Sequence, residues 1–96
     1  MEVIELSKVL DLVAAPVLLE NFLQKKGNNL QVSADQVQRV GAQCLQVLLA
    51  SRKAWEADGF DFSIVNPSEA FTEALTLMGV AVESLTYHAD DSHREE

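Results

Sequence analysis

The chain has 96 residues, of which 48% are hydrophobic and 23% charged, and its 15 acidic against 7 basic residues give a formal net charge of -8. A domain of this length buries roughly two-thirds of its unfolded surface, and no apolar run approaches the ~20 residues that a membrane-spanning helix needs. The surplus of acids excludes an electrostatic attraction to phosphate backbones or anionic membranes, so we expect protein partners.

The single cysteine, Cys44, excludes an internal disulfide and any cysteine-rich zinc site, and it suits a reducing compartment. The N-terminal stretch MEVIELSKV has an acid at its second position and lacks the basic and apolar regions of a secretory signal. We therefore expect a cytoplasmic protein.

The first two predicted elements are a short strand and a helix. In VIELS, Ile4 and Leu6 alternate with polar residues, as in a strand with one buried face. The next stretch predicts a helix over about Ala14–Lys26, with Pro16 in the first turn, lysines in the last turn and Gly27 as the C-terminal cap. The residues expected on its buried face follow helical spacing: Ala15, Leu18, Leu19, Phe22 and Leu23.

The centre of the chain predicts a strand, a helix and a further strand. LQVSA, at residues 30–34, alternates like the first strand segment. The leucine-rich stretch that follows predicts a helix over about Gln43–Ala57, and its wide apolar arc indicates the most buried helix of the fold. In FDFSIV, the side chains of Phe60, Phe62 and Ile64 again share one face.

The third helix has the clearest boundaries. Asn66 is the expected N-cap, Pro67 takes the first helical position, Glu69 stands three residues after the cap, and Gly79 ends the helix. Its expected buried face consists of Phe71, Ala74, Leu75 and Met78.

The alternation in all three strand segments indicates a sheet with one exposed face, because strands buried on both faces read as continuous Val, Ile and Leu. We therefore expect a two-layer α/β domain of about four mostly parallel strands, with three or four helices chiefly on one face and right-handed crossovers. The polar end of the chain, YHADDSHREE, predicts a disordered tail after Leu85. We assign residues 1–87 to the domain and residues 88–96 to the tail.

Three stretches of the chain carry a resemblance to a known family: KVLDLVAAPVLLENFL, VSADQVQRVGAQCLQVLLAS and FSIVNPSEAFTEALTLMGV. In order and spacing they are similar to the signature stretches of a STAS domain, the fold of bacterial anti-sigma-factor antagonists. Leu10 and Asp11 match the Leu-Asp pair before the family's first helix. GAQC stands at the position of the family's Asp-Ser-Ser-Gly, and Leu45, Leu48 and Leu49 match the Leu-x-x-Leu-Leu that follows it. The last stretch matches the family's strand, Pro-containing helix start and Leu-x-x-x-Gly ending. The resemblance covers about Val3–Val80 and implies the STAS fold.

Within this frame the chain departs from the family at the phosphorylation site. The family's phosphorylated serine falls on Ala42, the preceding aspartate falls on Gly41, and Cys44 takes the glycine position. A methyl group cannot be phosphorylated, so the resemblance implies that the start of the second helix keeps only its docking role. The residues of GAQC on their own also fit a simple connection between strand and helix. The residues expected to bind a partner are Asp11, Gly41, Ala42, Gln43, Gln46, Asn66 and Pro67.

The resemblance also implies a non-enzymatic protein-interaction module without a cofactor or a metal. Members of the family bind protein kinases, often of the histidine-kinase type, or subunits of transporters. The small size, the missing serine and the acidic tail favour a module that regulates a bacterial signalling kinase, such as the chemotaxis kinase CheA, and aids the dephosphorylation of a response regulator. The alternative within the same fold is a STAS subunit bound to the ATPase of a phospholipid ABC transport complex.

Other candidate sites have simpler interpretations. Cys44 near a helix N-terminus suggests a thiol enzyme, but without a neighbouring histidine or second cysteine it is interpreted as a small buried side chain. Trp55 is expected to pack on the sheet rather than to anchor a partner, and Asp11 has a sufficient role in starting the first helix. The C-terminal histidines and aspartates lack the helical spacing of metal ligands and are interpreted as a solvated charge run: His88, Asp90, Asp91 and His93.

Overall fold

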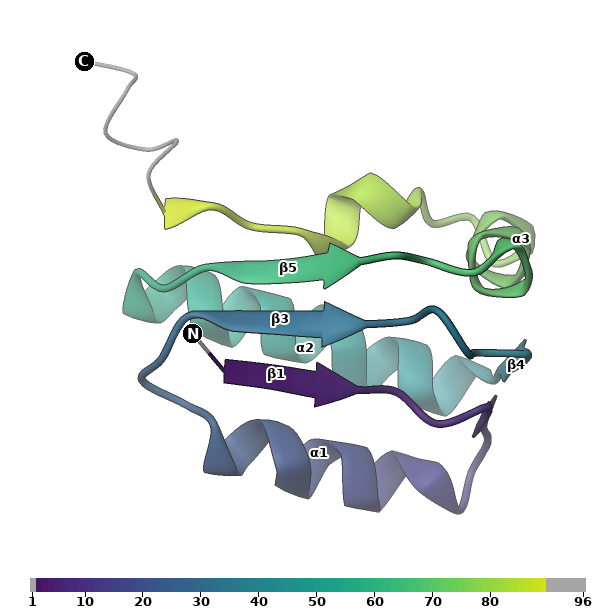
Figure 1. Ribbon diagram of the computed structural model, residues 1–96, viewed down its shortest axis with the longest axis horizontal. Coiled ribbons are helices and arrows are strands. Elements are labelled where there is room, and N and C mark those ends of the chain that lie inside the picture. Colours follow the sequence, from purple (N-terminus) through teal and green to yellow (C-terminus); the bar gives the residue numbers. More distant parts are fainter. Residues whose placement is uncertain (1, 90–96) are drawn as a thin grey trace.

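The computed structural model describes residues 2–89. Its main sheet has three parallel strands in the order β1-β3-β5, formed by β1 (Glu2–Glu5), β3 (Leu30–Ser33) and β5 (Phe62–Val65) (Figure 1). The register aligns Ile4 with Val32 and Val32 with Ile64. Each of these strands overlaps a segment whose alternating pattern predicts a strand.

A second parallel sheet consists of two strands of two residues each, β2 (Val9–Leu10) and β4 (Arg39–Val40). The backbone amides of Gln38 and Arg39 both donate to the carbonyl oxygen of Lys8, at 2.7 and 3.2 Å. This small sheet lies beyond the carboxyl ends of the main strands, where the chain enters the first two helices (Figure 1). The predicted α/β class with parallel strands is confirmed, although the strands are divided between two sheets.

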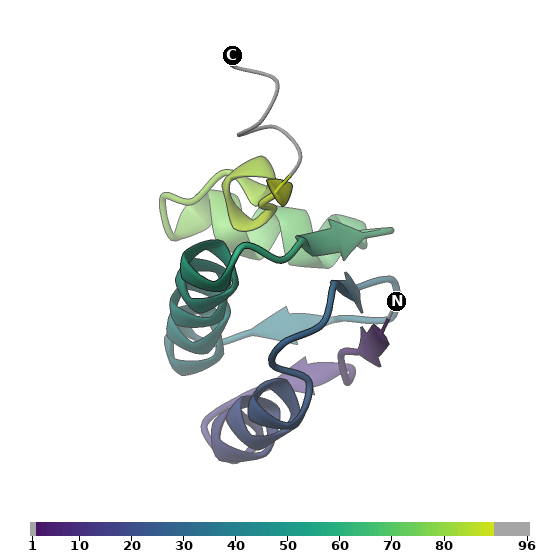
Figure 2. The ribbon, with the colours of Figure 1, turned by 90° about the vertical axis from the view of Figure 1, so that its left-hand side faces the viewer.

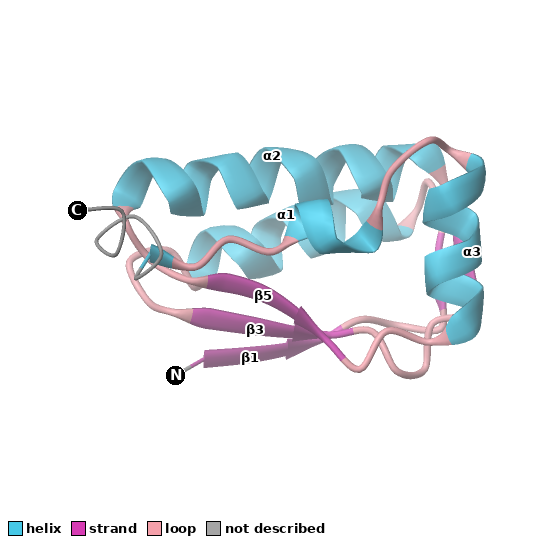
Figure 3. Ribbon diagram, turned by 90° about the horizontal axis from the view of Figure 1, so that it is seen from above, coloured by secondary structure: helices cyan, strands magenta, loops and turns pink. Residues whose placement is uncertain are grey.

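The helices α1 (Ala14–Gln24) and α2 (Ala42–Asp58) lie side by side on one face of the main sheet, which confirms the two-layer prediction (Figures 1 and 2). The helix α3 (Glu69–Leu77) lies beyond the carboxyl ends of the strands, and the short 3-10 helix η1 (Val82–Leu85) follows it (Figure 3). Within the described chain no helix covers the opposite face of the sheet (Figure 3). None of the described helices is long and apolar enough to cross a membrane.

The core between helices and sheet centres on three aromatic rings. The ring of Phe22 on α1 lies 6.2 Å from that of Trp55 on α2 and 5.6 Å from that of Phe62 on β5. The Trp55 and Phe62 rings are 5.5 Å apart, and the indole N–H donates to the carbonyl oxygen of Asn28 at 2.7 Å. The prediction that Trp55 packs against the sheet is therefore confirmed. Among the α-helices, α2 contributes the largest buried set: Cys44, Leu45, Leu48, Ser51 and Trp55.

The end of α1 and the start of α3 each differ from the prediction by two residues, and both ends of α2 differ by one. The first helix ends at Gln24, so both lysines after it lie outside the last turn. The N-cap of α3 is Ser68, so the assignments of the N-cap to Asn66 and of the first helical position to Pro67 are both wrong. Asn66 has a positive φ of 51°, a left-handed conformation that makes a turn, whereas an N-cap residue needs the extended backbone seen at Ser68.

The C-terminal part of the described chain adds to the main sheet beyond Leu85. Tyr87 pairs antiparallel with Phe62: its amide donates to the Phe62 carbonyl at 2.7 Å, and its carbonyl accepts from the Phe62 amide at 2.8 Å. The hydroxyl of Thr86 accepts a further hydrogen bond from a β5 amide at 3.1 Å. The prediction that the tail starts directly after Leu85 is therefore wrong for Thr86 and Tyr87. Residues 90–96 of the predicted tail lie outside the described residues.

Candidate functional site

The start of α2 is fixed by the small β2–β4 sheet. Gly41, the first residue after β4, donates its amide to the carbonyl oxygen of Leu10 at 2.7 Å. Gly41 has an extended backbone, and a Cβ atom at this position would lie 3.3 Å from the same carbonyl oxygen. The end of β2 therefore lies close to the start of α2, and a side chain at position 41 would require the Leu10 backbone to shift by a few tenths of an ångström.

The N-terminus of α2 has no capping side chain. Gly41 supplies only its carbonyl, which accepts from Leu45 at 3.2 Å, and the first turn contains no acidic residue. The amides of the first turn have no acceptor within the helix, so they carry the positive end of the helix dipole. Ala42, Gln43 and Gln46 are all exposed around this end. The result is an accessible helix end whose first-turn amides have no acceptor within residues 2–89.

Asp11 organises the junction between the two helix starts. Its carboxylate accepts a hydrogen bond from the Ala14 amide at 3.0 Å, which confirms a helix-starting role. Its backbone carbonyl accepts from the amides of Ala14 and Ala15, at 3.1 and 3.2 Å, and from the thiol of Cys44 on α2 at 3.3 Å. Asp11 is exposed, so one carboxylate face remains open to a partner.

Cys44 is packed inside the junction. Its side chain is 0% exposed, which confirms its interpretation as a buried small residue. Burial, followed by the negative charge of Asp11, raises the pKa of the Cys44 thiol above its ordinary value. A nucleophilic cysteine needs the opposite shift and access to solvent, so the geometry argues against thiol chemistry at this position.

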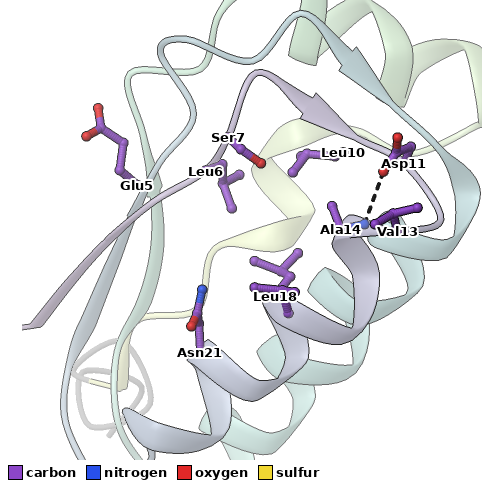
Figure 4. Close-up of a pocket in the computed structure, with 10 residues that line it drawn as sticks. Glu5, Leu6, Ser7, Leu10, Asp11, Val13, Ala14, Leu18 and Asn21 are labelled. Carbon is purple, nitrogen blue, oxygen red and sulfur yellow. Dashed lines mark hydrogen bonds between the residues drawn. The ribbon is translucent and has the colours of Figure 1, made fainter.

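A hollow of about 490 Å³ lies between the end of β1 and α1, close to Asp11 (Figure 4). Its lining includes Leu6 and Leu18, while the polar groups of Glu5, Asp11 and Asn21 stand apart around it (Figure 4). Nucleophilic and acid–base catalysis both require polar groups within hydrogen-bonding distance of one reacting atom. This hollow does not provide that arrangement.

The predicted residues at the start of α2 are neighbours, but they border different hollows. Gly41 and Asp11 border a hollow of about 420 Å³ that Ala74 of α3 closes on another side. Gln43 borders the groove between α1 and α2, whereas Gln46 borders a hollow on another side of α2, towards η1. A partner that contacted all of these residues would have to surround the end of the helix.

Asn66 and Pro67 are exposed in the loop between β5 and α3. The residue that follows them, Ser68, donates its amide to the Ala34 carbonyl at 3.0 Å and its hydroxyl to the Val37 carbonyl at 2.6 Å. These bonds hold the loop against the connection between β3 and β4. Within the described residues, no hydrogen bond or ion pair links Asn66 or Pro67 to the start of α2.

Sequence reasoning missed an exposed apolar surface on α1. Leu19 and Leu23, both predicted on the buried face, are 44% and 58% exposed. The buried residues of α1 are Ala15, Leu18 and Phe22, because the sheet and α2 cover only a narrow arc of this helix. The sequence did contain a signal for this surface, because apolar residues occur on more sides of α1 than one buried face can hold. The exposed apolar positions on and just before α1 are Leu12, Val13, Val17, Leu19 and Leu23.

The fold and the site define a small α/β module that presents an uncapped helix start and apolar helix surfaces, which is the arrangement of a binding surface. The chain belongs to the STAS domain family: the family model described as the Mlab STAS domain matches residues 2–87. STAS domains act as protein-interaction and regulatory modules. No curated protein and no solved structure gives a significant match to the chain.

Proposed function

We propose that this STAS domain docks onto a protein kinase through the start of α2, and that it does so without any modification. The observation that carries the proposal is Ala42, an exposed methyl group at the position that resembles the family's phosphorylated serine. Relatives with a serine lose or gain a partner when phosphate adds charge there. A methyl group keeps this surface permanently in its uncharged state.

The chemistry of the surface supports a protein partner. Gln43 and Gln46 offer amide donors and acceptors beside the unpaired backbone amides of the helix start. Asp11 adds a carboxylate at the same junction. A partner would bind with backbone carbonyls or polar side chains aimed at the end of the helix.

The partner that we propose is a histidine kinase, such as the chemotaxis kinase CheA. The small size, the alanine at the serine position and the acidic composition resemble the short STAS protein CheS of bacterial chemotaxis clusters. In that role the module would hold the kinase in a state that drains phosphate from a response regulator. The site residues proposed for the contact are those near the α2 start, with Asn66 and Pro67 as an outer part of the interface.

A second candidate partner follows from the family match. The matching model is described as the Mlab STAS domain, which favours a STAS subunit that binds the ATPase of a phospholipid ABC transport complex. The docking surface would be the same, since both candidates use the uncharged start of α2. The two functions therefore differ in the partner and not in the mechanism of contact.

The substitution Ala42→Asp tests the docking surface. In the free domain it should be neutral or slightly stabilising, because an anion at a helix N-terminus gains about 0.3 to 1 kcal/mol. In the complex the carboxylate would be buried without a partner, which costs about 2 to 5 kcal/mol, or roughly 30-fold to several thousand-fold in affinity. Calorimetric titration of the variant against the isolated kinase, together with thermal melts, measures both effects.

Ala81→Asp is the matched control, because Ala81 is also an exposed alanine before a helical turn but lies at η1. It should bind the kinase as tightly as the parent chain. If Ala42→Asp melts normally and also binds like the parent, the interface lies elsewhere on the domain. A parallel titration with the transport ATPase separates the two candidates, because only the true partner should show binding that Ala42→Asp weakens.

A further inference from the structure

The outward side of the α1–α2 layer carries an apolar surface that nothing in the described chain covers. Leu12, Leu19 and Leu23 are 68%, 44% and 58% exposed along it. The two helices form the outer layer of the domain, both starting beside the β2–β4 sheet and ending near the opposite end of the main strands (Figures 1 and 3). We call this surface the helical face and define it by eight residues: Leu12, Pro16, Leu19, Leu23, Gln43, Val47, Ala50 and Ala54.

The helical face consists of two matching stripes. The α1 stripe consists of Pro16, Leu19 and Leu23 on the helix and of Leu12 in the turn just before it, and the α2 stripe has positions 43, 47, 50 and 54. The helical positions of both stripes follow the spacing of three and four residues that places side chains in one line along a helix. The two stripes are also level with each other, because Leu12, Pro16 and Leu19 share one hollow with Gln43 and Val47, while Leu19 and Leu23 share the next with Ala50 and Ala54.

The side chains of the two stripes differ in size, and the large ones of one stripe fit the small ones of the other. The α1 stripe projects three leucines, whereas the second half of the α2 stripe has only the methyl groups of Ala50 and Ala54. A ridge of large side chains packs closely against a row of small ones on another helix. Consider a second copy related by a two-fold axis that runs parallel to the groove between α1 and α2. Each α1 then lies over the partner copy's α2. Leu19 and Leu23 of one copy lie over Ala50 and Ala54 of the other.

The charges around the helical face fit the same arrangement. Lys26 and Asp58 at one end pair with each other at 3.7 Å. Glu20 on α1 and Lys53 on α2 form no ion pair within residues 2–89. The face is therefore close to neutral in a chain of formal charge -8. Lys53 borders the hollow beside Ala50, at the outer edge of the helical face, and we expect the two-fold arrangement to bring Glu20 of each copy near Lys53 of the other.

From these observations we infer that the helical face binds a second copy of this chain and forms a symmetric dimer, with α1 of one protomer over α2 of its partner. The surface is self-complementary in both size and charge, as an interface with two-fold symmetry requires. Residues 90–96 of the same chain are not a suitable occupant, because their sequence DDSHREE contains no apolar side chain. The inference rests on observations other than those behind the kinase or ATPase partner, although the helical face and the proposed docking surface share Gln43.

Sedimentation velocity at increasing protein concentration tests the dimer. The parent chain should shift from monomer to dimer, and Leu23→Glu should weaken the association by roughly tenfold or more, because it buries a charge within the face where Leu23 lies over the partner copy's alanines. Leu77→Glu is the matched control: Leu77 is 88% exposed on α3, and its variant should dimerise like the parent. A parent chain that remains monomeric up to about 1 mM overturns the inference.

A charge-reversal cycle tests the orientation of the two copies. Glu20→Lys and Lys53→Glu should each weaken the dimer by roughly tenfold, since each creates two like-charge pairs, and the double variant should restore the parent's association. Thermal melts verify that all variants fold. A dimer whose association is unchanged by both single reversals overturns the proposed arrangement.

Crosslinking gives an independent measurement. A chain with Leu19→Cys mixed with a chain with Ala50→Cys should form a mixed disulfide under mild oxidation, whereas Leu77→Cys mixed with Ala50→Cys should not. Equal yields from the two mixtures contradict the proposed face.

Discussion

Cys44 illustrates how a single residue can resemble a reactive site and serve a different purpose. The thiol lies in the first turn of α2, where the helix dipole favours a thiolate. Burial and the charge of Asp11 outweigh the dipole and raise the pKa of the thiol. The thiol instead donates to the Asp11 carbonyl at 3.3 Å and so joins the start of α2 to the start of α1.

Replacing Cys44 should therefore affect stability and leave binding intact. Cys44→Ala or Cys44→Ser should lower the free energy of unfolding by about 1 kcal/mol, through lost packing or a buried hydroxyl, and partner affinity should not change. Denaturant unfolding and calorimetric titration measure the two quantities. A Cys44→Ser chain that folds fully but loses its activity would make a thiol enzyme the better hypothesis.

The direction of the Cys44 pKa also predicts a pH dependence. The folded state holds the thiol proton more tightly than the unfolded chain, whose thiol titrates near 9.0. This contribution to stability is present below the unfolded pKa and is lost as the pH rises through the higher folded pKa. The parent chain should lose more stability than Cys44→Ala between neutral and strongly alkaline pH, and equal losses would contradict the shift.

Among the elements, α3 shows why helix boundaries are hard to predict from sequence. The run Asn66, Pro67, Ser68 and Glu69 contains two possible caps, and both are residue types that begin helices. The choice of Ser68 depends on tertiary contacts, since its hydroxyl also donates to the Val37 carbonyl from the β3–β4 connection. The sequence pattern around the helix start contains no information about the Val37 carbonyl, so it cannot distinguish Ser68 from Asn66.

Ser68→Ala should consequently cost more than the loss of a cap alone. The variant removes the acceptor of the Phe71 amide and leaves the Val37 carbonyl without its donor, so we expect a destabilisation of about 1 to 2 kcal/mol. Ser7→Ala, at an exposed serine, is the control and should be nearly neutral. Denaturant midpoints compare the variants. A Ser68→Ala chain as stable as Ser7→Ala would show that the cap contributes nothing.

For the whole molecule, hydrophobic periodicity predicts the main helices and strands, whereas features that depend on tertiary contacts cannot be predicted from it. The strands of the main sheet alternate clearly, whereas β2 and β4 have two residues each and show no period. The residues near Gly41 are adjacent along the chain, so their proximity could be predicted, whereas the different hollows that they border depend on α1, α3 and η1. The exposure of Leu19 and Leu23 depends on how much of α1 its neighbours cover, which helical spacing alone does not contain.

The C-terminal boundary gives a test at this scale. A chain that ends at Tyr87 loses the hydrogen bond from the Ala89 amide to Asp61 and should keep nearly the parent's melting temperature. A chain that ends at Leu85 also loses the Thr86 and Tyr87 bonds to β5 and should melt several degrees lower, since about 1 kcal/mol corresponds to 4 to 8 °C in a domain of this size. If the first truncation lowers the melting temperature as much as the second, the domain extends beyond residue 87.

The close approach at Gly41 makes two adjacent positions unequal in what they can accept. A single substitution, Ala42→Ser, would place a hydroxyl at the exposed start of α2 without a clash at that exposed position. An aspartate at position 41 is harder to accommodate, because its Cβ atom would lie 3.3 Å from the Leu10 carbonyl, and the end of β2 would have to yield by a few tenths of an ångström. An acidic side chain at position 41 would therefore need a compensating shift near Leu10, whereas a hydroxyl at position 42 needs none.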